Sequence, residues 1–358
     1  MLLSSPWMVI VMVLLQAGMA HAQTKTQNGR SIDVQELDAF IQRQMDSLAI
    51  PGLSVAVIRN GEVVYHRLWG VKSLATRVSL DDQAMFDAAS LTKSVFAYFA
   101  LKMVDRGMIS LDTPLYKYCP YPDIQYDERY KLITARMVLS HSSGFPNWRR
   151  FNKDRMLDIK FTPGTDWMYS GEGYEYLAKV LAHLHHQEID GLNALIQEYV
   201  FGPLQMKHSS MVWNDQVAAH RVDGHIQGEV KAGWGISDDK PGLYASYSLQ
   251  SEALDYAHFL VALMSGRGLS SERARDLFDI QIRAKTEQRA WGLGIEIEEL
   301  GNGRLLFKHG GFNNNFSSGY AFSKDTRSGF VFFANNDSGN KMNDILRRYL
   351  AALFPGNR

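Results

Sequence analysis

The chain has 358 residues, enough for one large domain or two smaller ones, and its hydrophobic share of 46% and charged share of 21% are ordinary for a globular protein. Lys and Arg number 38, Asp and Glu also 38, so the formal net charge is zero. A chain with no net charge and no polybasic tract lacks the excess of positive charge that binding to nucleic acid or to an anionic membrane surface usually requires. We therefore expect neither as a partner.

The N-terminus has the pattern of an export signal. Residues 1–22 carry no charged side chain, are apolar from Trp7 to Leu15, and end in Ala20-His21-Ala22, a small-x-small cleavage pattern. We predict a signal peptide over 1–22, cleaved after Ala22, and a mature domain over 23–358. An uncleaved membrane anchor is the alternative, although the stretch is short for a spanning helix.

Cys119 is the only cysteine. An exported protein of this sequence therefore has no internal disulfide, and no cysteine follows the signal to carry a lipid anchor. We expect a periplasmic or secreted protein without stable membrane insertion. The sequence leaves its oligomeric state open.

The mature chain begins with a predicted helix and hairpin. A capping-box pattern starts at Asp33 and is followed by apolar residues at helical spacing, which predicts a helix over 34–48. Asn60-Gly61 is a strong signal for a two-residue turn, and apolar runs flank it at 53–58 and 63–68. The sheet is expected to begin there.

The pattern then changes along the chain. From about 85 to 285 it is mainly helical with long irregular links, and the expected helices there include 132–140, 172–186, 190–200 and 252–265. Strands return at 292–298, 305–308, 318–322 and 329–334, and a helix over 340–353 closes the chain.

Strands at both ends of the chain around a helical middle predict an α+β fold. One antiparallel sheet would be assembled from residues 31–84 and 286–358 and flanked by the terminal helices. The large, mainly helical region over 85–285 would be inserted between the two sheet parts. The cleft between sheet and helical region is the expected place for a site.

Ser90 and Lys93 set a hydroxyl and an amine three residues apart at the start of the apolar run 91–101. Residues three apart share a helix face, and a run that is apolar nearly all round predicts a buried helix. Burial disfavours the ammonium form of a lysine, so Lys93 is a candidate base for the Ser90 hydroxyl. The alternative is an N-cap serine beside a solvated lysine.

Two other segments share the Ser-x-x-Lys spacing, Ser237-Asp238-Asp239-Lys240 and Ser338-Gly339-Asn340-Lys341. Both lie among polar, turn-forming residues, so we predict solvated loops there. Three histidines, His183, His185 and His186, lie on one helical segment, but no Asp, Glu or Cys stands at a convincing ligand spacing. We predict no metal and no organic cofactor.

Further motifs follow Ser90 in an order that suits its chemistry. Tyr169 stands just before an expected helix, and His309-Gly310-Gly311 ends an expected strand. Together with four ordered segments, the chain resembles the serine β-lactamase and penicillin-binding protein superfamily, in particular the branch of class C β-lactamases, D-alanyl-D-alanine carboxypeptidases and related esterases. The segments are 109–114, 133–144, 201–206 and 291–294.

The resemblance implies roles for individual residues. Ser90 would be the acylated nucleophile, Lys93 its proton acceptor, and Tyr169 a partner in proton transfer to the leaving group and from the deacylating water. Backbone N–H groups of Ser90 and Phe312 would form the oxyanion hole. The residues that would contact the substrate are His309, Gly310, Gly311 and Asn313.

Two departures from the family motifs narrow the function. Gly171 stands where the motif has asparagine, which disfavours efficient β-lactam turnover, and His309 replaces a lysine, which makes recognition of a substrate carboxylate weaker or pH-dependent. We predict a serine hydrolase that cleaves a small ester or D-amino-acid peptide more readily than a β-lactam.

Two alternatives come from other classes of protein. A penicillin-binding or peptidoglycan-sensing protein would be acylated with little turnover, and the glycine at position 171 is the feature that favours it. A lipase of the α/β-hydrolase fold is disfavoured, because the sequence has no Gly-x-Ser-x-Gly elbow.

Overall fold

The computed structural model describes residues 24–25, 31–231, 242–284, 289–300 and 303–353. Its main sheet has eight strands: β3 (Gly52–Arg59), β4 (Glu62–Gly70), β9 (Ile282–Arg283), β10 (Ala290–Trp291), β11 (Glu296–Glu299), β12 (Leu305–Phe312), β13 (Ser317–Ser323) and β14 (Ser328–Ala334). They lie in the order β4-β3-β14-β13-β12-β11-β10-β9, and every neighbouring pair is antiparallel.

The sheet joins the two ends of the chain. β3, from the N-terminal part, pairs with β14, from the C-terminal part, in a register that sets Val55 opposite Phe332. The predicted α+β fold with one antiparallel sheet is therefore confirmed. The sheet extends to β9, a few residues ahead of position 286.

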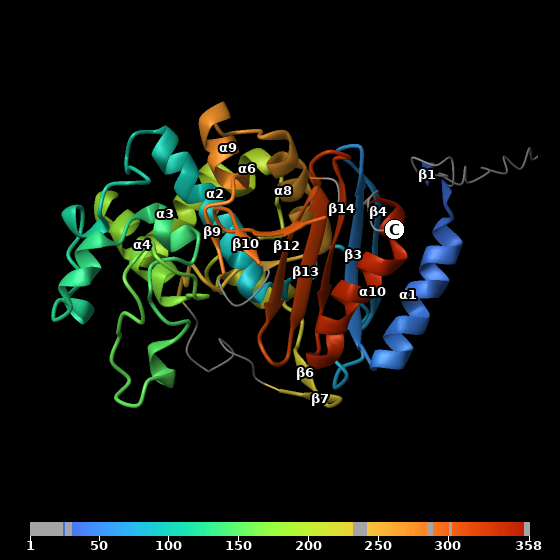
Figure 1. Cartoon of the computed structure of the whole chain (residues 1–358). Coiled ribbons are helices and arrows are strands. Elements are labelled where there is room, and N and C mark those ends of the chain that lie inside the picture. The colour runs from blue at the N-terminus through green and yellow to red at the C-terminus, as the bar shows by residue number, and fades with distance from the viewer. Residues whose placement is uncertain (1–23, 26–30, 232–241, 285–288, 301–302, 354–358) are drawn as a thin grey trace, which may run out of the picture.

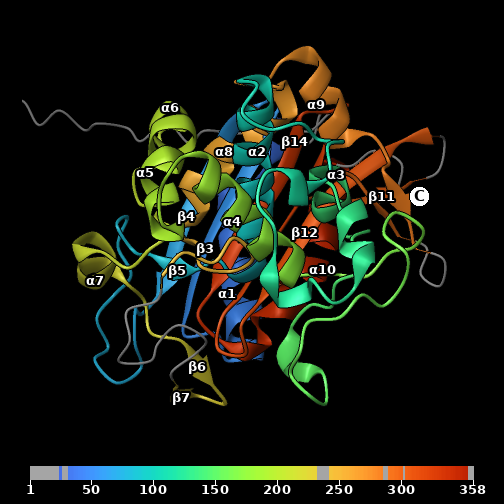
Figure 2. The same ribbon diagram turned by 90° about the vertical axis from the view of Figure 1, so that its left-hand side faces the viewer.

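The α-helices are α1 (Val34–Leu48), α2 (Thr92–Asp105), α3 (Ala135–Leu139), α4 (Glu172–Leu184), α5 (Leu192–Ile196), α6 (Gly202–Leu204), α7 (Asp215–His220), α8 (Ala253–Ser265), α9 (Ser271–Phe278) and α10 (Met342–Tyr349). α1 and α10 lie on one face of the sheet, and the helices from the middle of the chain lie on the other (Figure 1). Figure 2 looks onto the helical side, with α2 and α4 in front of the strands.

Short strands complete the structure: β1 (Thr24–Lys25) pairs with β2 (Ser31–Ile32), β5 (Phe86–Asp87) with β8 (Gln250–Ser251), and β6 (His225–Ile226) with β7 (Glu229–Val230). The β5–β8 pair lies within the part of the chain that the sequence predicts to be mainly helical. It connects the start of the Ser90 segment to the residues ahead of α8.

Alternation along β3 builds two cores. Val55 and Val57 belong to the apolar cluster that includes residues of α1 and α10, whereas Ala56 and Ile58 belong to the larger cluster that includes α2 and α8. Successive side chains of a strand point to opposite faces, so the buried apolar run Val55–Ile58 shows that β3 is covered on both sides. The sheet is thus the middle layer of three.

The predicted N-terminal elements are present. α1 has the predicted bounds 34–48, and the Asp33 side chain accepts hydrogen bonds from the backbone of the first turn at Gln35 and Glu36. At the β3–β4 turn, Asn60 and Gly61 have φ angles of +52° and +83°, as a hairpin turn of this type requires.

The predicted strand over 292–298 is only partly present: residues 296–298 belong to β11, but 292–295 do not form a strand. β10 ends at Trp291 and β11 starts at Glu296, and a turn lies between them in which the Gly292 N–H donates to the Ile295 carbonyl at 3.0 Å. Gly294 has a φ of +79°, and a Cβ there would lie 2.3 Å from the Ala97 Cβ of α2. Close contact with α2 therefore interrupts the strand, although the apolar alternation continues through it.

Other predicted segments have mixed outcomes. The final helix, expected over 340–353, consists of α10 between two 3₁₀ turns, Asp337–Lys341 and Ala351–Leu353. Ser338 lies in the first of these turns and donates to the Leu48 carbonyl at 2.6 Å. The segments 1–22 and 237–240 lie outside the described residues. Within the described ranges no helix has the length and apolarity to span a membrane.

Candidate active site

Ser90 lies at the junction of β5 and α2. A 3₁₀ turn, η1 (Ala89–Leu91), leads directly into α2, and Ala89 has a φ of +46°. A positive φ is strained for alanine, and the Asp87 carboxylate, which accepts a hydrogen bond from the Ala89 N–H at 2.9 Å, helps to hold it. The backbone before Ser90 is thereby fixed in one conformation.

Lys93 lies one turn after Ser90 and is 1% exposed. Its Nζ donates to the Ser90 Oγ at 3.3 Å and to the Ser246 carbonyl at 2.8 Å. Burial lowers the pKa of Lys93 to about 7, although the charge of Glu175 acts in the opposite direction. This position and this lowered pKa are what a proton acceptor for the Ser90 hydroxyl would need near neutral pH.

Tyr169 faces the same pair. A hydrogen bond joins the Tyr169 and Ser90 side chains, and the Lys93 Nζ lies 4.7 Å from the centre of the tyrosine ring. Burial raises the pKa of Tyr169, so the phenol keeps its proton. The next residue, Ser170, donates its N–H to Nδ1 of the buried His141 at 3.0 Å, which holds the tyrosine segment against α3 and α4.

His309, predicted to titrate near neutral pH, is instead buried beside Tyr169. Burial is the main cause that lowers its pKa to about 3, and the charge of Lys93 adds to the effect. Its Nδ1 lies 2.9 Å from the Gly310 carbonyl, so the neutral ring donates there and Nε2 is left as an acceptor. The expectation of a pH-dependent cation at this position is therefore corrected, because the side chain is neutral at physiological pH.

Gly311 brings β12 into contact with the Ser90 backbone. A Cβ at Gly311 would lie 2.5 Å from the Ala88 carbonyl oxygen and 3.2 Å from the Ser90 nitrogen. Phe312, the next residue, is 49% exposed and lines the same cavity as Ser90. The predicted oxyanion-hole residues, Ser90 and Phe312, thus come from η1 and β12. These two elements can lie this close together because Gly311 has no side chain.

We expect Gly311→Ala to destabilise the protein by about 1–3 kcal/mol, because the new methyl group overlaps backbone atoms that cannot move aside without opening the β12–η1 contact. Thermal denaturation followed by circular dichroism measures the change. Gly310→Ala is the matched control for stability, because a Cβ at Gly310 meets no atom within 4 Å. Equal melting temperatures for the two variants would contradict this explanation.

Asn313 lies below the cavity rather than on its wall. Its side chain is buried and its Nδ2 donates to the Asp87 carboxylate, the group that also holds Ala89. One carboxylate therefore connects the residue before Ser90 to the residue after Phe312. Burial raises the pKa of Asp87 to about 7, and both hydrogen bonds oppose that shift.

A cavity of about 350 Å³ opens above Ser90. Its lining includes Tyr169, Trp291, His309 and Phe312 and the charged residues Arg289 and Glu296. The Arg289 Nε lies 3.7 Å from a Glu296 carboxylate oxygen. The cavity lining thus carries one charge of each sign, and the two charged side chains lie next to each other.

The glycine at position 171 has a structural cause. A Cβ there would lie 2.8 Å from the Asn147 carbonyl oxygen and 3.0 Å from the tip of the Trp148 ring. The Gly171 N–H donates to Asn147 at its side-chain oxygen, 3.0 Å away. The 147–148 segment therefore occupies the space that an asparagine side chain would need.

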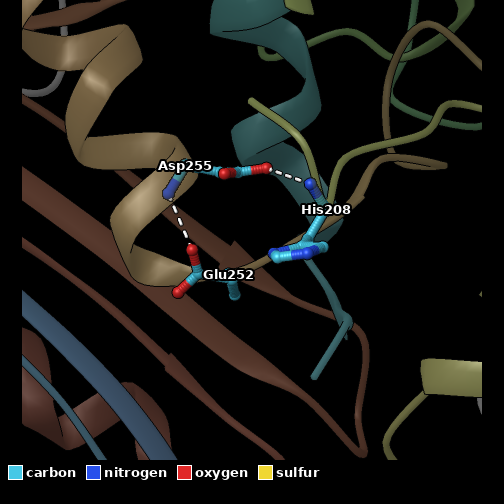
Figure 3. A group of neighbouring side chains, drawn as sticks. All are labelled: His208, Glu252 and Asp255. Carbon is cyan, nitrogen blue, oxygen red and sulfur yellow. Dashed lines mark hydrogen bonds between the residues drawn. The ribbon is translucent and has the colours of Figure 1, made fainter. Parts of the chain in front are cut away.

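One group of described residues has the proximity that a metal ion requires: ligand atoms of His208, Glu252 and Asp255 lie within 4.8 Å of one another (Figure 3). The carboxylates already have partners, however. Glu252 caps α8 by accepting from the Leu254 and Asp255 N–H groups, and Asp255 accepts from the His208 N–H at 2.6 Å. We assign this group a structural role at the start of α8.

A family comparison identifies the fold that carries this site. The family model described as Beta-lactamase matches residues 37–353, which include every residue of the site. The chain belongs to the Beta-lactamase family.

Individual relatives are distant. Protein flp of Staphylococcus aureus (strain MW2) is 22% identical over 326 residues, covering 85% of this chain but only 63% of flp, so the chain spans less than two thirds of that relative. An uncharacterised protein of Alkalihalophilus pseudofirmus is 26% identical over 249 residues, covering 64% of this chain and 68% of the relative.

A solved structure has the same fold. The octameric penicillin-binding protein homologue from Pyrococcus abyssi superimposes with a TM-score of 0.73 at 22% identity, covering 89% of this chain and 78% of the homologue. The predicted membership in the serine β-lactamase and penicillin-binding protein superfamily is confirmed.

The structure brings Ser90, Lys93, Tyr169, His309 and Phe312 to one place, as predicted. It also adds two carboxylates that sequence patterns missed, Asp87 beneath Ser90 and Glu175 beside Lys93. Asp87 precedes Ser90 by three residues, a spacing at which an aspartate side chain often caps the first turn of a helix. The sequence could therefore have predicted a contact between Asp87 and the Ser90 turn. Glu175 had no comparable signal, because its partners lie 70 residues away at Ala245 and Ser246.

Proposed function

We propose that the protein is an exported serine hydrolase that cleaves an ester or amide through an acyl-enzyme on Ser90. The observation that carries the proposal is the 3.3 Å contact of Ser90 Oγ with the buried Lys93 amine, at the foot of a cavity large enough for a small substrate. Membership in the Beta-lactamase family supports it.

In the acylation step, Ser90 Oγ attacks the substrate carbonyl carbon while its proton passes to the neutral Lys93 amine. The negative charge on the carbonyl oxygen is stabilised by the backbone N–H groups of Ser90 and Phe312. The carbon–leaving-group bond then breaks, and the Tyr169 phenol donates a proton to the departing oxygen or nitrogen. Lys93 returns a proton to Tyr169, so that both groups regain their starting states.

In the deacylation step, a water molecule attacks the Ser90 ester. Tyr169 and Lys93 together take its proton, and Ser90 Oγ leaves with a proton from the same pair. The products are a carboxylic acid and the regenerated serine. No step requires a metal or an organic cofactor.

An uncharged ester is the substrate that the cavity favours. Its lining includes three aromatic side chains, Tyr169, Trp291 and Phe312, and the neutral His309 offers no cation to a substrate carboxylate at the position where the family motif has lysine. The glycine at position 171 also leaves the site without the amide of the family motif. Both features weaken the case for efficient β-lactam turnover.

One observation favours a second candidate, a D-amino-acid peptidase or a penicillin-binding protein. Arg289 lines the same cavity, and its guanidinium group suits binding of a terminal carboxylate. The nearby Glu296 offsets its charge, which is why we rank this candidate second.

We expect acylation to speed up as the pH rises through about 7, where Lys93 loses its proton, and then to level off. The pKa of Lys93 is lowered, so the neutral base is present well below the range of a free lysine, about 10.4. The release of p-nitrophenol from p-nitrophenyl acetate in the first turnover, measured against pH, checks this. A rate that still rises through the free-lysine range would contradict a neutral Lys93.

The experiment that tests the proposal mixes the purified mature chain, wild type and Ser90→Ala, with p-nitrophenyl acetate, a penicillin and a D-Ala-D-Ala peptide. Product release and the mass of the protein are followed together. We expect Ser90-dependent turnover of the ester and slower turnover of the penicillin. A Ser90 adduct that persists with every substrate would favour the penicillin-binding candidate, and ester hydrolysis by Ser90→Ala at the wild-type rate would contradict both.

Export is part of the proposal and has its own test. The N-terminal pattern supports cleavage after Ala22, so we expect a full-length gene product to yield a mature chain that begins at Gln23. The mass of the protein recovered from the periplasm or medium of an expressing bacterium checks this. An uncleaved chain in the membrane fraction would favour the anchor.

A further inference from the structure

Glu175 is a carboxylate next to the site that the proposed mechanism does not use. It lies on the first turn of α4, one helical turn after Gly171, and is partly buried. It accepts hydrogen bonds from the N–H groups of Ala245, at 3.1 Å, and Ser246, at 3.2 Å, and a third from the Ser246 hydroxyl. A single side chain thus fixes the loop ahead of β8 by three hydrogen bonds.

That loop supplies a partner of Lys93. The Ser246 carbonyl accepts a hydrogen bond from Lys93 Nζ at 2.8 Å, which is shorter than the 3.3 Å contact of the amine with Ser90 Oγ. The residue that Glu175 holds by its N–H and hydroxyl is therefore the residue that holds Lys93 by its carbonyl. Movement of the loop would release the amine from its position below Ser90.

Charge connects the two groups as well. The negative charge of Glu175 raises the pKa of Lys93, and the positive charge of Lys93 lowers the pKa of Glu175, which burial raises. The other titratable groups that face Lys93 are Tyr169 and Tyr174, through their rings, and His141 and His309.

Those other groups do not change charge near neutral pH. Burial raises the pKa of Tyr169 and Tyr174, and it lowers the pKa of His141 and His309, so all four are neutral there. Tyr247, which faces Glu175, also has a raised pKa because it is buried. Among the groups named, Glu175 is the one whose charge acts on Lys93 in the range where the enzyme would work.

We propose that Glu175 is a positioning residue for Lys93. It holds the Ser246 carbonyl against the Lys93 amine, and its negative charge stabilises the ammonium form of Lys93. A carboxylate on α4 thus controls the base, whereas Gly171 at the start of the same helix has no side chain to do so. The inference rests on the role of Lys93 proposed above. It predicts two separable effects of Glu175, one on the geometry of Lys93 and one on the pH at which Lys93 loses its proton.

Glu175→Gln separates these effects. Without the carboxylate charge the ammonium form of Lys93 is less stable, so its pKa falls and the neutral base forms at lower pH. We expect the acid limb of the acylation profile, measured with p-nitrophenyl acetate, to move down by about one pH unit, since an adjacent opposite charge typically shifts a pKa by that order. A residue that served only the fold would lower the rate at every pH and leave the limb in place.

Two further variants complete the test. Glu175→Asp keeps the charge, and we expect its limb to stay at the wild-type pH even if the rate falls. Ser246→Ala removes only a hydroxyl whose hydrogen bond favours the ionised form of Glu175, so it should move the limb in the same direction as Glu175→Gln but less. Because this variant leaves the backbone contacts intact, it decides the question if Glu175→Gln does not fold.

The outcomes are distinct. A limb at the wild-type pH in Ser246→Ala and in any folded Glu175→Gln would overturn this inference and leave the Ser90 mechanism standing. Acylation of the wild type that does not depend on Ser90, measured beside Ser90→Ala, would overturn the proposed function and the inference with it.

Discussion

Ser90→Ala is expected to lower the rate of ester hydrolysis by about 10⁴-fold or more and to abolish the covalent adduct, because the acyl group then has no oxygen to bind. The fold should remain, since Ser90 is only partly buried and the replacement fits the same turn. Steady-state hydrolysis of p-nitrophenyl acetate, with the melting temperature as a check on folding, measures both effects.

Ser338→Ala is the matched control for that variant. Ser338 stands three residues before a lysine, as Ser90 does, but it lies in a 3₁₀ turn where its hydroxyl donates to the Leu48 carbonyl. We expect it to leave hydrolysis unchanged. A similar loss of activity in Ser338→Ala would mean that the Ser-x-x-Lys spacing alone does not identify the reactive serine.

Lys93→Met should lower the rate of acylation by about 10²–10⁴-fold, the usual contribution of a positioned acid or base. Methionine fills nearly the same volume and is compatible with the apolar surroundings of α2, so the loss should come from chemistry rather than unfolding. The pH limb near 7 should disappear as well, because no titrating base remains. First-turnover kinetics across the pH range measure both effects.

Lys102→Met provides the comparison on the same helix. The Lys102 Nζ donates to the Gly268 carbonyl at 3.0 Å, at the far end of α2 from Ser90. We expect acylation and its pH profile to match the wild type. If Lys93→Met retained the limb near 7, the base would have to be a different group, and the proposed mechanism would be wrong.

The parts of this molecule that could be predicted from sequence are those that local patterns determine. Asn60-Gly61 specifies its own turn by the φ angles it tolerates, and the apolar run after Ser90 specifies a buried helix on which residues 90 and 93 share a face. The order of motifs around Tyr169 and His309 predicted the family, and the family model matches most of the chain.

The parts that could not be predicted depend on contacts between distant segments. Trp291, Leu293 and Ile295 alternate as a strand would, but α2 lies so close that Gly294 must turn there. A histidine such as His309 ordinarily changes its charge near neutral pH. Only the burial of His309 in the structure shows that its side chain stays uncharged there. Glu175 resembles an ordinary polar residue of an amphipathic helix until the loop at Ser246 is placed beside it.

The central claim is that Ser90 carries the acyl group of the substrate. The most direct test is mass spectrometry of wild-type protein that is quenched in acid soon after mixing with p-nitrophenyl acetate or a penicillin, followed by digestion and fragment sequencing. We predict one acyl group per chain, located on Ser90. Hydrolysis of the ester with no adduct, or with an adduct on a different residue, would contradict the account.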